Sequence, residues 1–365
     1  MSTVHQNTYA HVLQTAATEF VDKVERVGLA SLLRAYGTSG LRKDAIVRDR
    51  PRLVPEMGDA VDLLCLSRPV PAHKAVSILT DPILDHLLGI GAATASGGDV
   101  ELSHIRLVEH FGRLVFVGAV NNSGFGWYGR DSIGIGRQLI GARGRCLDVC
   151  SSTGCQTTVM AASATSVTAV EIDEQVAPLF ELNMCINRSR AKVDALWCDV
   201  REAEFDTSFD TIAINAPMMP TFGILDLPWT GHGGPDGTML LNAVMQRVPL
   251  AEHGRLVANA MILGNEHDLE ADWLRQLAEE RGWAVTVIPT DHEPLTADSS
   301  FVRSALAAYS AVKPDDMDSV MQELSTSWTA NATDRLYFAL VCATAGSGPA
   351  FSIASTALKG DRWCL

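Results

Sequence analysis

Two carboxylates at the ends of consecutive apolar runs indicate a site for a ribose-bearing ligand. Asp148 lies in the first run, 147–149, and Glu171 ends the second run, 167–171. Between them a turn of small residues, 150–154, ends at Gly154. Small residues let the backbone approach a ligand closely, and a carboxylate about 20 residues further on can bind both ribose hydroxyls. The spacing predicts a nucleotide-type site, although neither a Gly-Lys-Ser/Thr sequence nor a full G-x-G-x-x-G fingerprint is present.

Polar residues also follow the next two apolar runs. Asp199 comes after Ala195–Cys198, and Asn215 comes after Phe209–Ile214. In an open α/β sheet, ligands bind outside the carboxyl ends of the strands, near the point where the strand order reverses. We therefore expect the polar groups at these strand ends to serve one ligand.

The order of these motifs resembles the class I S-adenosylmethionine (SAM) methyltransferases. It is most similar to the release-factor glutamine methyltransferase-like family, whose core reads Leu-Asp-x-Gly-x-Gly-x-Gly, then Val-x-Ala-Val-Asp-Ile-Asp, then Asn-Pro-Pro-Tyr. The resemblance covers about residues 120–265, including the glycine-rich loop 231–237. It implies a Rossmann-like α/β fold with a seven-stranded sheet, SAM as the cofactor and transferase activity.

The resemblance also implies a role for each matching position. Glu171 would bind the ribose hydroxyls, and Ile172 would cover one face of the adenine. Asp199 would accept from the adenine amino group, with the backbone of Val200 beside it, and Asn215 would lie at the methyl-accepting site. The positions implied to face the methionine end and the ribose are Asp148, Cys150, Ser151, Ser152 and Gly154.

Two departures from the family pattern concern the cofactor turn and the acceptor. Cys150 and Ser152 stand where the family has glycine, and residues 215–218 read Asn-Ala-Pro-Met instead of Asn-Pro-Pro-Tyr. The tyrosine that packs on a planar amide or base is thus replaced by an adaptable methionine, which argues against glutamine or adenine as the acceptor. The substrate-binding candidates in this motif are Pro217, Met218 and Met219.

The segment 125–136 supplies three more substrate-binding candidates. Related methyltransferases have an equivalent segment at the amino side of the SAM pocket, so Trp127, Tyr128 and Asp131 are expected to line it. An aromatic face near a sulfonium gains about 0.5–2 kcal/mol of cation–π attraction. Packing in the core is the alternative for both rings, and Asp131 is also predicted to N-cap a helix that ends before Gly141.

Methyl transfer is an in-line displacement at the sulfonium carbon, so the protein mainly has to position the acceptor, and no metal is expected. Asn215 can orient an acceptor but cannot take its proton. Asp236 and His232, in the glycine-rich loop, are the candidates for that role. The alternatives are an Asx turn for Asn215 and a plain exposed loop for the other two.

We predict a methyltransferase that acts on an N or O atom of a small molecule. Three alternatives stay open. The first is methylation of a macromolecular glutamine, and the second is transfer or cyclisation of the aminocarboxypropyl arm of SAM, which the altered turn at Cys150 and Ser152 suggests. The third is SAM binding without catalysis.

The composition of the chain indicates which partners and which compartment to expect. The chain of 365 residues has a net charge of −14, which opposes binding to phosphate backbones, so no nucleic acid is expected. Its eight cysteines include no C-x-x-C pair, which fits a reducing cytoplasm. Neither a leader peptide nor a run of about 20 apolar residues is seen, so we expect a cytoplasmic protein without a membrane segment. The oligomeric state is left open.

Hydrophobic periodicity predicts the elements around this core. Residues 1–98 are expected to form an N-terminal helical cap domain, with apolar residues at helical spacing over 8–36 and shorter helices at 59–66 and 81–90. The cap is expected either to close over the substrate or simply to pack on the remainder of the chain.

Residues 99–345 are expected to form the SAM-binding catalytic domain, with a β-hairpin at 104–117 and a core at 120–343. The tail 346–365 is expected to be loosely held.

The carboxyl-terminal half of the core should complete the sheet. We expect helices at 268–281 and 299–312 and strands at 284–288 and 336–343. The helix at 299–312 and the polar segment 313–334 lie between the last two strands and are read as an insertion that adds to the substrate wall.

Overall fold

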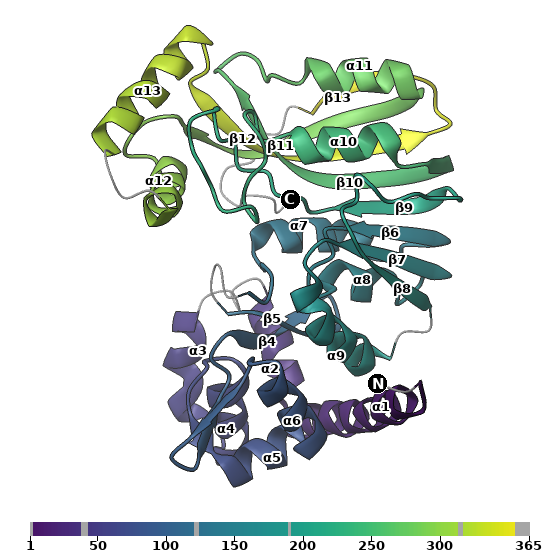
Figure 1. Cartoon of the computed structure of the whole chain (residues 1–365), viewed down its shortest axis with the longest axis vertical. Coiled ribbons are helices and arrows are strands. Elements are labelled where there is room, and N and C mark those ends of the chain that lie inside the picture. The colour runs from purple at the N-terminus through teal and green to yellow at the C-terminus, as the bar shows by residue number, and fades with distance from the viewer. Residues whose placement is uncertain (1–2, 38–42, 120–123, 189–190, 313–316, 355–365) are drawn as a thin grey trace. The chain divides into compact units, whose positions relative to one another are not determined.

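The chain forms two compact units, each with its own hydrophobic core. The first unit consists of residues 1–129 and 151–197, and the second of residues 130–150 and 198–365. The computed structural model, drawn in Figure 1, describes residues 3–37, 43–119, 124–188, 191–312 and 317–354.

The amino-terminal part of the first unit is helical (Figure 1). The helices predicted within 8–36, 59–66 and 81–90 are present, whereas the short helices α3 and α5 were not predicted. Gly28 turns the chain between the first two helices with a φ of 80°, a conformation that suits glycine. The helices are α1 (Thr3–Arg26), α2 (Leu29–Tyr36), α3 (Lys43–Asp49), α4 (Pro55–Leu64), α5 (Ala72–Leu79) and α6 (Asp81–Gly89).

The first unit also contains two small antiparallel sheets. Strands β1 (Val70–Pro71), β3 (Asp99–Glu101) and β2 (Thr94–Ser96) pair in that order. Strands β4 (Ile105–His110) and β5 (Arg113–Gly118) form the predicted hairpin. Its two turn residues, Phe111 and Gly112, both have positive φ, as a two-residue turn between twisted strands requires.

The remainder of the first unit has the strand and helix alternation of an α/β fold. Helix α8 (Cys155–Met160) precedes β7 (Ser166–Glu171), and α9 (Ala177–Asn187) precedes β8 (Lys192–Trp197). Strands β7 and β8 pair in parallel, with Glu171 opposite Trp197 at their carboxyl ends.

Helix α9 joins these parts of the first unit into one core. Its Leu179 and Leu182 are fully buried with the apolar residues of the amino-terminal helices, and Phe20 of α1 stacks on Phe116 of β5 with ring centroids 5.8 Å apart. The buried Asn183 side chain accepts from the backbone N–H of Phe116 at 2.8 Å and donates to the Phe116 and Thr153 carbonyls at 2.9 and 2.8 Å. One amide therefore ties α9 to the hairpin and to the turn before α8.

The second unit contains six hydrogen-bonded strands among its described residues. Their order is β13-β11-β12-β10-β9-β6. The pairs β6–β9, β9–β10 and β11–β13 are parallel, whereas β12 runs antiparallel to both of its neighbours. The strands are β6 (Arg145–Val149), β9 (Phe209–Ile214), β10 (Leu250–Gly264), β11 (Trp283–Pro294), β12 (Arg335–Ala345) and β13 (Ala350–Ile353).

Most of the predicted elements of the second unit are present, and two segments differ. The polar segment 313–334 contains a helix, α13, because Val320, Leu324 and Trp328 recur at helical spacing and are buried in one cluster. Residues 350–353 of the predicted loose tail instead form β13 beside β11. The helices are α7 (Arg130–Leu139), α10 (Met239–Arg247), α11 (Asp272–Arg281), α12 (Ser300–Val312) and α13 (Met317–Ala330).

The predicted fold class is confirmed. The chain is an α/β protein with the mixed, mostly parallel strand pairing of a methyltransferase-like Rossmann fold, preceded by helices and small antiparallel sheets. The seven strands expected for the sheet, β6 to β12, are all present, and β13 is an addition. The division into domains at residues 98 and 345 stays a prediction. No helix within the described ranges is both long and apolar enough to cross a bilayer.

We predict that Asn183→Leu lowers the free energy of unfolding by about 2–4 kcal/mol, because three buried backbone groups lose their partner. Urea denaturation measures this change. The control is Glu181→Ala, an exposed change on the same helix, which should shift the free energy by less than about 0.5 kcal/mol. Equal stability of the two variants would show that the Asn183 bonds are unimportant.

Candidate functional site

The turn after β6 has an unusual backbone. Cys150, Ser152 and Gly154 have φ angles of 59°, 49° and 83°, so every second residue is left-handed. These are the three positions that are glycine in the methyltransferase family pattern that the sequence resembles. Cys150 and Ser152 thus keep the backbone of a glycine turn, at a cost of about 1–2 kcal/mol for each residue that carries a Cβ.

The packing explains why Gly154 remains glycine. A Cβ at this position would lie 2.9 Å from the Phe180 ring and 2.7 Å from Cε of Met184, both on α9. The side chain of Ser152 is instead accommodated by Gly126, where an added Cβ would overlap Ser152 Oγ. Glycine is therefore required at the one turn position that lies under a helix.

Two hydroxyl groups in this turn are buried without a partner among the described residues, namely Ser151 Oγ and Ser152 Oγ. A buried hydroxyl without a hydrogen bond is costly, so such groups need an explanation in a native fold. A small polar ligand at the turn would supply the missing partners. The turn therefore fits the polar methionine end of SAM.

Glu171, at the carboxyl end of β7, is held against the same turn. Its carboxylate accepts from the backbone N–H of Ser152 at 2.8 Å and from that of Asp173 at 3.0 Å, and only 8% of the residue is exposed. Burial raises the pKa of Glu171, while the backbone hydrogen bonds act in the opposite direction. The next residue, Ile172, is 53% exposed. An oriented carboxylate beside an exposed apolar side chain suits a ribose diol and a purine face.

In the second unit, Asn215 belongs to a polar network. It lies directly after β9, and its Nδ2 donates to Asp131 Oδ2 at 3.1 Å and to Ser132 Oγ at 3.4 Å. Asn259 donates to Asn215 Oδ1 at 3.0 Å and to the Asp131 carbonyl at 2.9 Å. The amide of Asn215 is therefore fixed in orientation by α7 on one side and β10 on the other.

Sequence reasoning missed Asn259 and misplaced Asp131. Asn259 is 1% exposed in the middle of β10, and its only signal is that it interrupts an otherwise apolar run, 256–263. Asp131 was predicted as an N-cap, but α7 begins at Arg130, so Asp131 lies inside the first turn. Its carboxylate accepts from Asn215 Nδ2.

The two remaining acidic candidates differ in their surroundings. Asp148 is fully buried within β6. Asp199 accepts from the backbone N–H of Arg201 at 2.9 Å and from its Nε at 3.0 Å, and this hydrogen bonding to Arg201 lowers the pKa of Asp199. An adenine amino group at Asp199 would therefore share the carboxylate with Arg201. Val200 between them is buried.

The loop 231–237 pairs with the segment that follows Asn215. The backbone of Met219 accepts from Gly233 and donates to Gly231, at 2.9 and 3.0 Å. Both carboxylate oxygens of Asp236 accept from Thr238 at 2.9 Å, directly before α10. His232 Nδ1 accepts from the Gly234 N–H at 3.3 Å. Both proposed proton acceptors thus have local bonds that shape this loop.

The aromatic candidates of the first unit have different surroundings. Trp127 is 52% exposed, whereas Tyr128 is buried and its hydroxyl lies 3.0 Å from His110 Nδ1. His110 Nε2 lies 3.2 Å from Gln156 Oε1, an acceptor, so Nε2 carries the proton and Nδ1 accepts from Tyr128. Burial lowers the pKa of His110 to about 4, which keeps the ring neutral. Tyr128 is thus part of a buried hydrogen-bonded chain.

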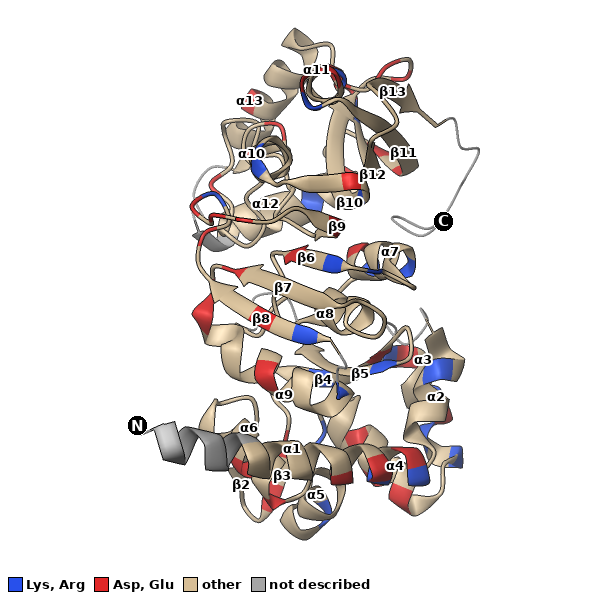
Figure 2. Cartoon of the chain, turned by 90° about the vertical axis from the view of Figure 1, so that its right-hand side faces the viewer, with Lys and Arg blue, Asp and Glu red and all other residues tan. Residues whose placement is uncertain are grey.

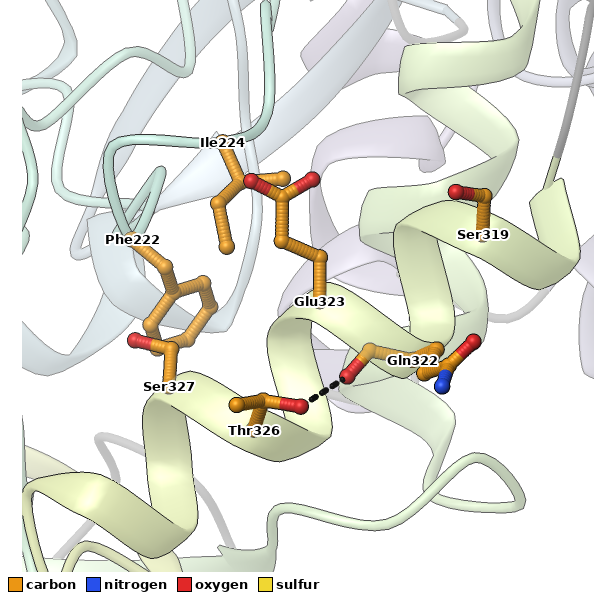
Figure 3. Close-up of a pocket in the computed structure, with 7 residues that line it drawn as sticks. All are labelled: Phe222, Ile224, Ser319, Gln322, Glu323, Thr326 and Ser327. Carbon is orange, nitrogen blue, oxygen red and sulfur yellow. Dashed lines mark hydrogen bonds between the residues drawn. The ribbon is translucent and has the colours of Figure 1, made fainter.

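The second unit also has an open groove of about 600 Å³ beside α13. Phe222 and Ile224 come from the segment after the acceptor motif (Figure 3). Within that motif, Pro217, Met218 and Met219 are half-buried. From α13 the groove is lined by Ser319, Gln322, Glu323, Thr326 and Ser327.

Lys, Arg, Asp and Glu occur along both units (Figure 2), and metal-binding side chains are not clustered in the described part of the chain. In the view of Figure 2, Lys and Arg are scattered among Asp and Glu in both units. No three His, Cys, Asp or Glu side chains within the described ranges are grouped so that they could hold a metal ion.

Comparison with solved structures finds proteins of low similarity, all below 15% sequence identity and below a TM-score of 0.5. Trm5b from Pyrococcus abyssi matches with a TM-score of 0.40 and 13% identity over 69% of this chain and 62% of its own. The YcgJ protein from Bacillus subtilis matches with a TM-score of 0.38 and 12% identity over 59% and 99%. Phosphoethanolamine N-methyltransferase 2 from Haemonchus contortus, in complex with SAM, matches with a TM-score of 0.32 and 14% identity over 59% and 52%. Likeness at this level carries no information on the acceptor.

Comparison by sequence identifies no relative. No family model matches this chain, and no curated protein does.

The predicted site residues therefore fall into two sets, and their roles stay predictions. The structure brings Glu171 to Ser152 in the first unit and Asn215 to Asp131 in the second. The first unit contains Trp127, Tyr128, Ser151, Ser152, Gly154, Glu171 and Ile172. The second contains Asp131, Asp148, Cys150, Asp199, Val200, Asn215, Pro217, Met218, Met219, His232 and Asp236.

We predict that Gly154→Ala lowers the free energy of unfolding by about 2–4 kcal/mol, because it combines a strained φ with overlap against α9. Chemical denaturation measures this loss. Ser152→Gly is the matched control in the same turn. Its free energy of unfolding should stay within about 1 kcal/mol of the parent value, because glycine relieves the backbone strain of the folded state but raises the conformational entropy of the unfolded chain. Tolerance of alanine at position 154 would contradict this account of the turn.

Proposed function

We propose that this protein binds SAM and transfers its methyl group to an N or O atom of a small molecule. The observation that carries the proposal is the turn 150–154. It keeps left-handed φ angles at the three family glycine positions, and its Ser152 N–H is bonded to the Glu171 carboxylate. Bound SAM would supply a methyl group on a sulfonium that is open to in-line displacement.

The residues at the turn and at the end of β7 suit the parts of the cofactor that they would hold. Each Glu171 oxygen accepts one backbone N–H and retains lone pairs for the hydroxyls of a ribose. Ser151 and Ser152 offer buried hydroxyl groups to the methionine end. Ile172 offers its exposed apolar surface to the adenine. Asp199 would accept from the adenine amino group while it keeps its hydrogen bonds from Arg201.

The network around Asn215 suits the acceptor. The hydrogen bonds from Asn259 and to Asp131 fix the Asn215 amide, and its oxygen has a second lone pair that can orient an N–H or O–H group. A proton released on transfer needs a base near this amide. Asp131 is hydrogen-bonded to Asn215 itself, whereas the bonds described for Asp236 and His232 go to Thr238 and Gly234. We therefore favour Asp131 over Asp236 and His232 for this role.

Two observations favour methyl transfer to a small molecule over the alternatives. Met218 stands where the glutamine-modifying relatives have tyrosine, so a planar amide loses its packing partner. The turn keeps a glycine-like backbone despite Cys150 and Ser152, which supports a family-like placement of the methionine end rather than attack on the aminocarboxypropyl arm.

The reaction type is tested by mass spectrometry of the spent cofactor. The protein is incubated with SAM and a small-molecule extract, with Asn215→Ala as the control. We expect S-adenosylhomocysteine together with one product heavier by a methyl group. Methylthioadenosine would show that another carbon of SAM is attacked. Turnover only with release factor or ribosomes would show that the acceptor is a macromolecule.

We predict that Glu171→Ala weakens binding of S-adenosylhomocysteine by about 100-fold or more, since two hydrogen bonds to a charged group contribute about 1.5–3 kcal/mol each. Asn215→Ala should keep affinity within about threefold but slow product formation by about 100-fold, because it disturbs only the acceptor. Isothermal titration and initial rates measure the two effects.

The matched controls for these variants are Glu174→Ala and Asn331→Ala, which change the same residue types at exposed positions. Both should bind and react like the parent protein. Normal affinity in Glu171→Ala would exclude its role as the ribose ligand.

A further inference from the structure

One arginine of the first unit is buried without a counter-charge. Arg106, on β4, is 8% exposed, and its Nε is completely buried. Within the described residues its guanidinium makes no hydrogen bond and no ion pair. Because arginine stays protonated, a buried guanidinium without a partner destabilises the fold unless a ligand compensates it.

No anion acts on Arg106 from the described residues around it. Arg106 and His110 lie on the same face of the hairpin, because alternate strand residues point the same way. Tyr128 and Cys65 raise the pKa of Arg106, against the effect of burial, which lowers it. Burial raises the pKa of Cys65 to about 12, so the thiol is neutral, and His110 is neutral as well.

A second cation lies close to Arg106. Lys43 is the first residue of α3, and burial, followed by the charge of Arg106, lowers the pKa of Lys43. Among the described residues, no carboxylate pairs with Lys43 either. Two cations that repel each other therefore share one region of the first unit.

Three carboxylates of α3 and α4 are already paired with other cations. Asp62 binds Arg50 and Arg68, and Asp59 binds Lys74. Asp49 likewise binds Arg48 and Arg52 on α3 and the adjoining turn. The segments of the first unit that the structure does not describe contain no Asp or Glu. Among the described residues, no ion pair joins a carboxylate of the unit to Arg106 or Lys43, so an anion from outside would be their counter-charge.

We propose that Arg106 and Lys43 bind the anionic group, a carboxylate or a phosphate, of a small-molecule ligand. A guanidinium can donate two parallel hydrogen bonds to either group, and the ammonium adds a point charge. The Tyr128 hydroxyl, which is held by His110, also acts electrostatically on Arg106. This site does not depend on the proposed methyl transfer.

The test is anion binding by the full chain, with sodium phosphate and sodium acetate as probes and sodium chloride at equal ionic strength as the reference. Thermal unfolding and isothermal titration are the measurements. We expect phosphate, acetate or both to raise the unfolding temperature above the chloride value. Binding of phosphate alone would indicate a phosphorylated ligand, and binding of acetate a carboxylated one.

Three variants assign the effect to the site. Arg106→Met should unfold at a higher temperature than the parent protein in chloride, because an unpaired buried charge is removed, and should lose the response to the anion. Lys43→Met, at a half-buried position, should weaken anion binding at least about fivefold. Arg113→Met, on the other strand of the hairpin, is the matched control and should respond like the parent.

The proposal is overturned if neither anion exceeds chloride in the parent protein. It is also overturned if Arg106→Met and Lys43→Met bind the anion as tightly as Arg113→Met. Should Arg106→Met fail to fold, the affinity of Lys43→Met decides alone.

Discussion

The carboxylate of Glu171 holds the end of β7 against the turn 150–154, and the candidate cofactor site depends on this interaction. Left-handed φ angles at Cys150 and Ser152 are unfavourable, so the surrounding structure has to impose them. Ser152 donates to Glu171, the Ser151 N–H donates to the Val170 carbonyl, and Thr153 accepts from Asn183. Together these bonds maintain a glycine-type turn that contains only one glycine.

The second unit fixes its key amide in a similar way, with side chains in place of backbone groups. Asn215 is oriented by Asp131 and Asn259, which belong to α7 and β10. A network in a buried sheet restricts side-chain rotation more strongly than a surface loop does, since unpaired polar groups are costly there. An acceptor would therefore meet a preset amide, and little reorganisation would be needed during transfer.

The strand ends and their polar residues were predictable, because an apolar run followed by a carboxylate or an amide is a local pattern. Asn183 and Asn259 were not, since each is a single polar residue in an apolar run whose partners lie far away in the sequence. Helix α13 was hidden because only Val320, Leu324 and Trp328 mark its buried face. The hydrogen bond between Asp131 and Asn215 joins residues 84 positions apart, which no local capping rule reveals.

The most direct test of the central claim is amide hydrogen exchange with and without S-adenosylhomocysteine, because it reports on the turn and on Glu171 in the unmodified protein. We expect slower exchange in peptides covering 150–156 and 171–175 when the ligand is present. Peptides covering β11 and β13 should be unchanged. Identical exchange of the turn at saturating ligand would contradict the assignment of this turn to the cofactor.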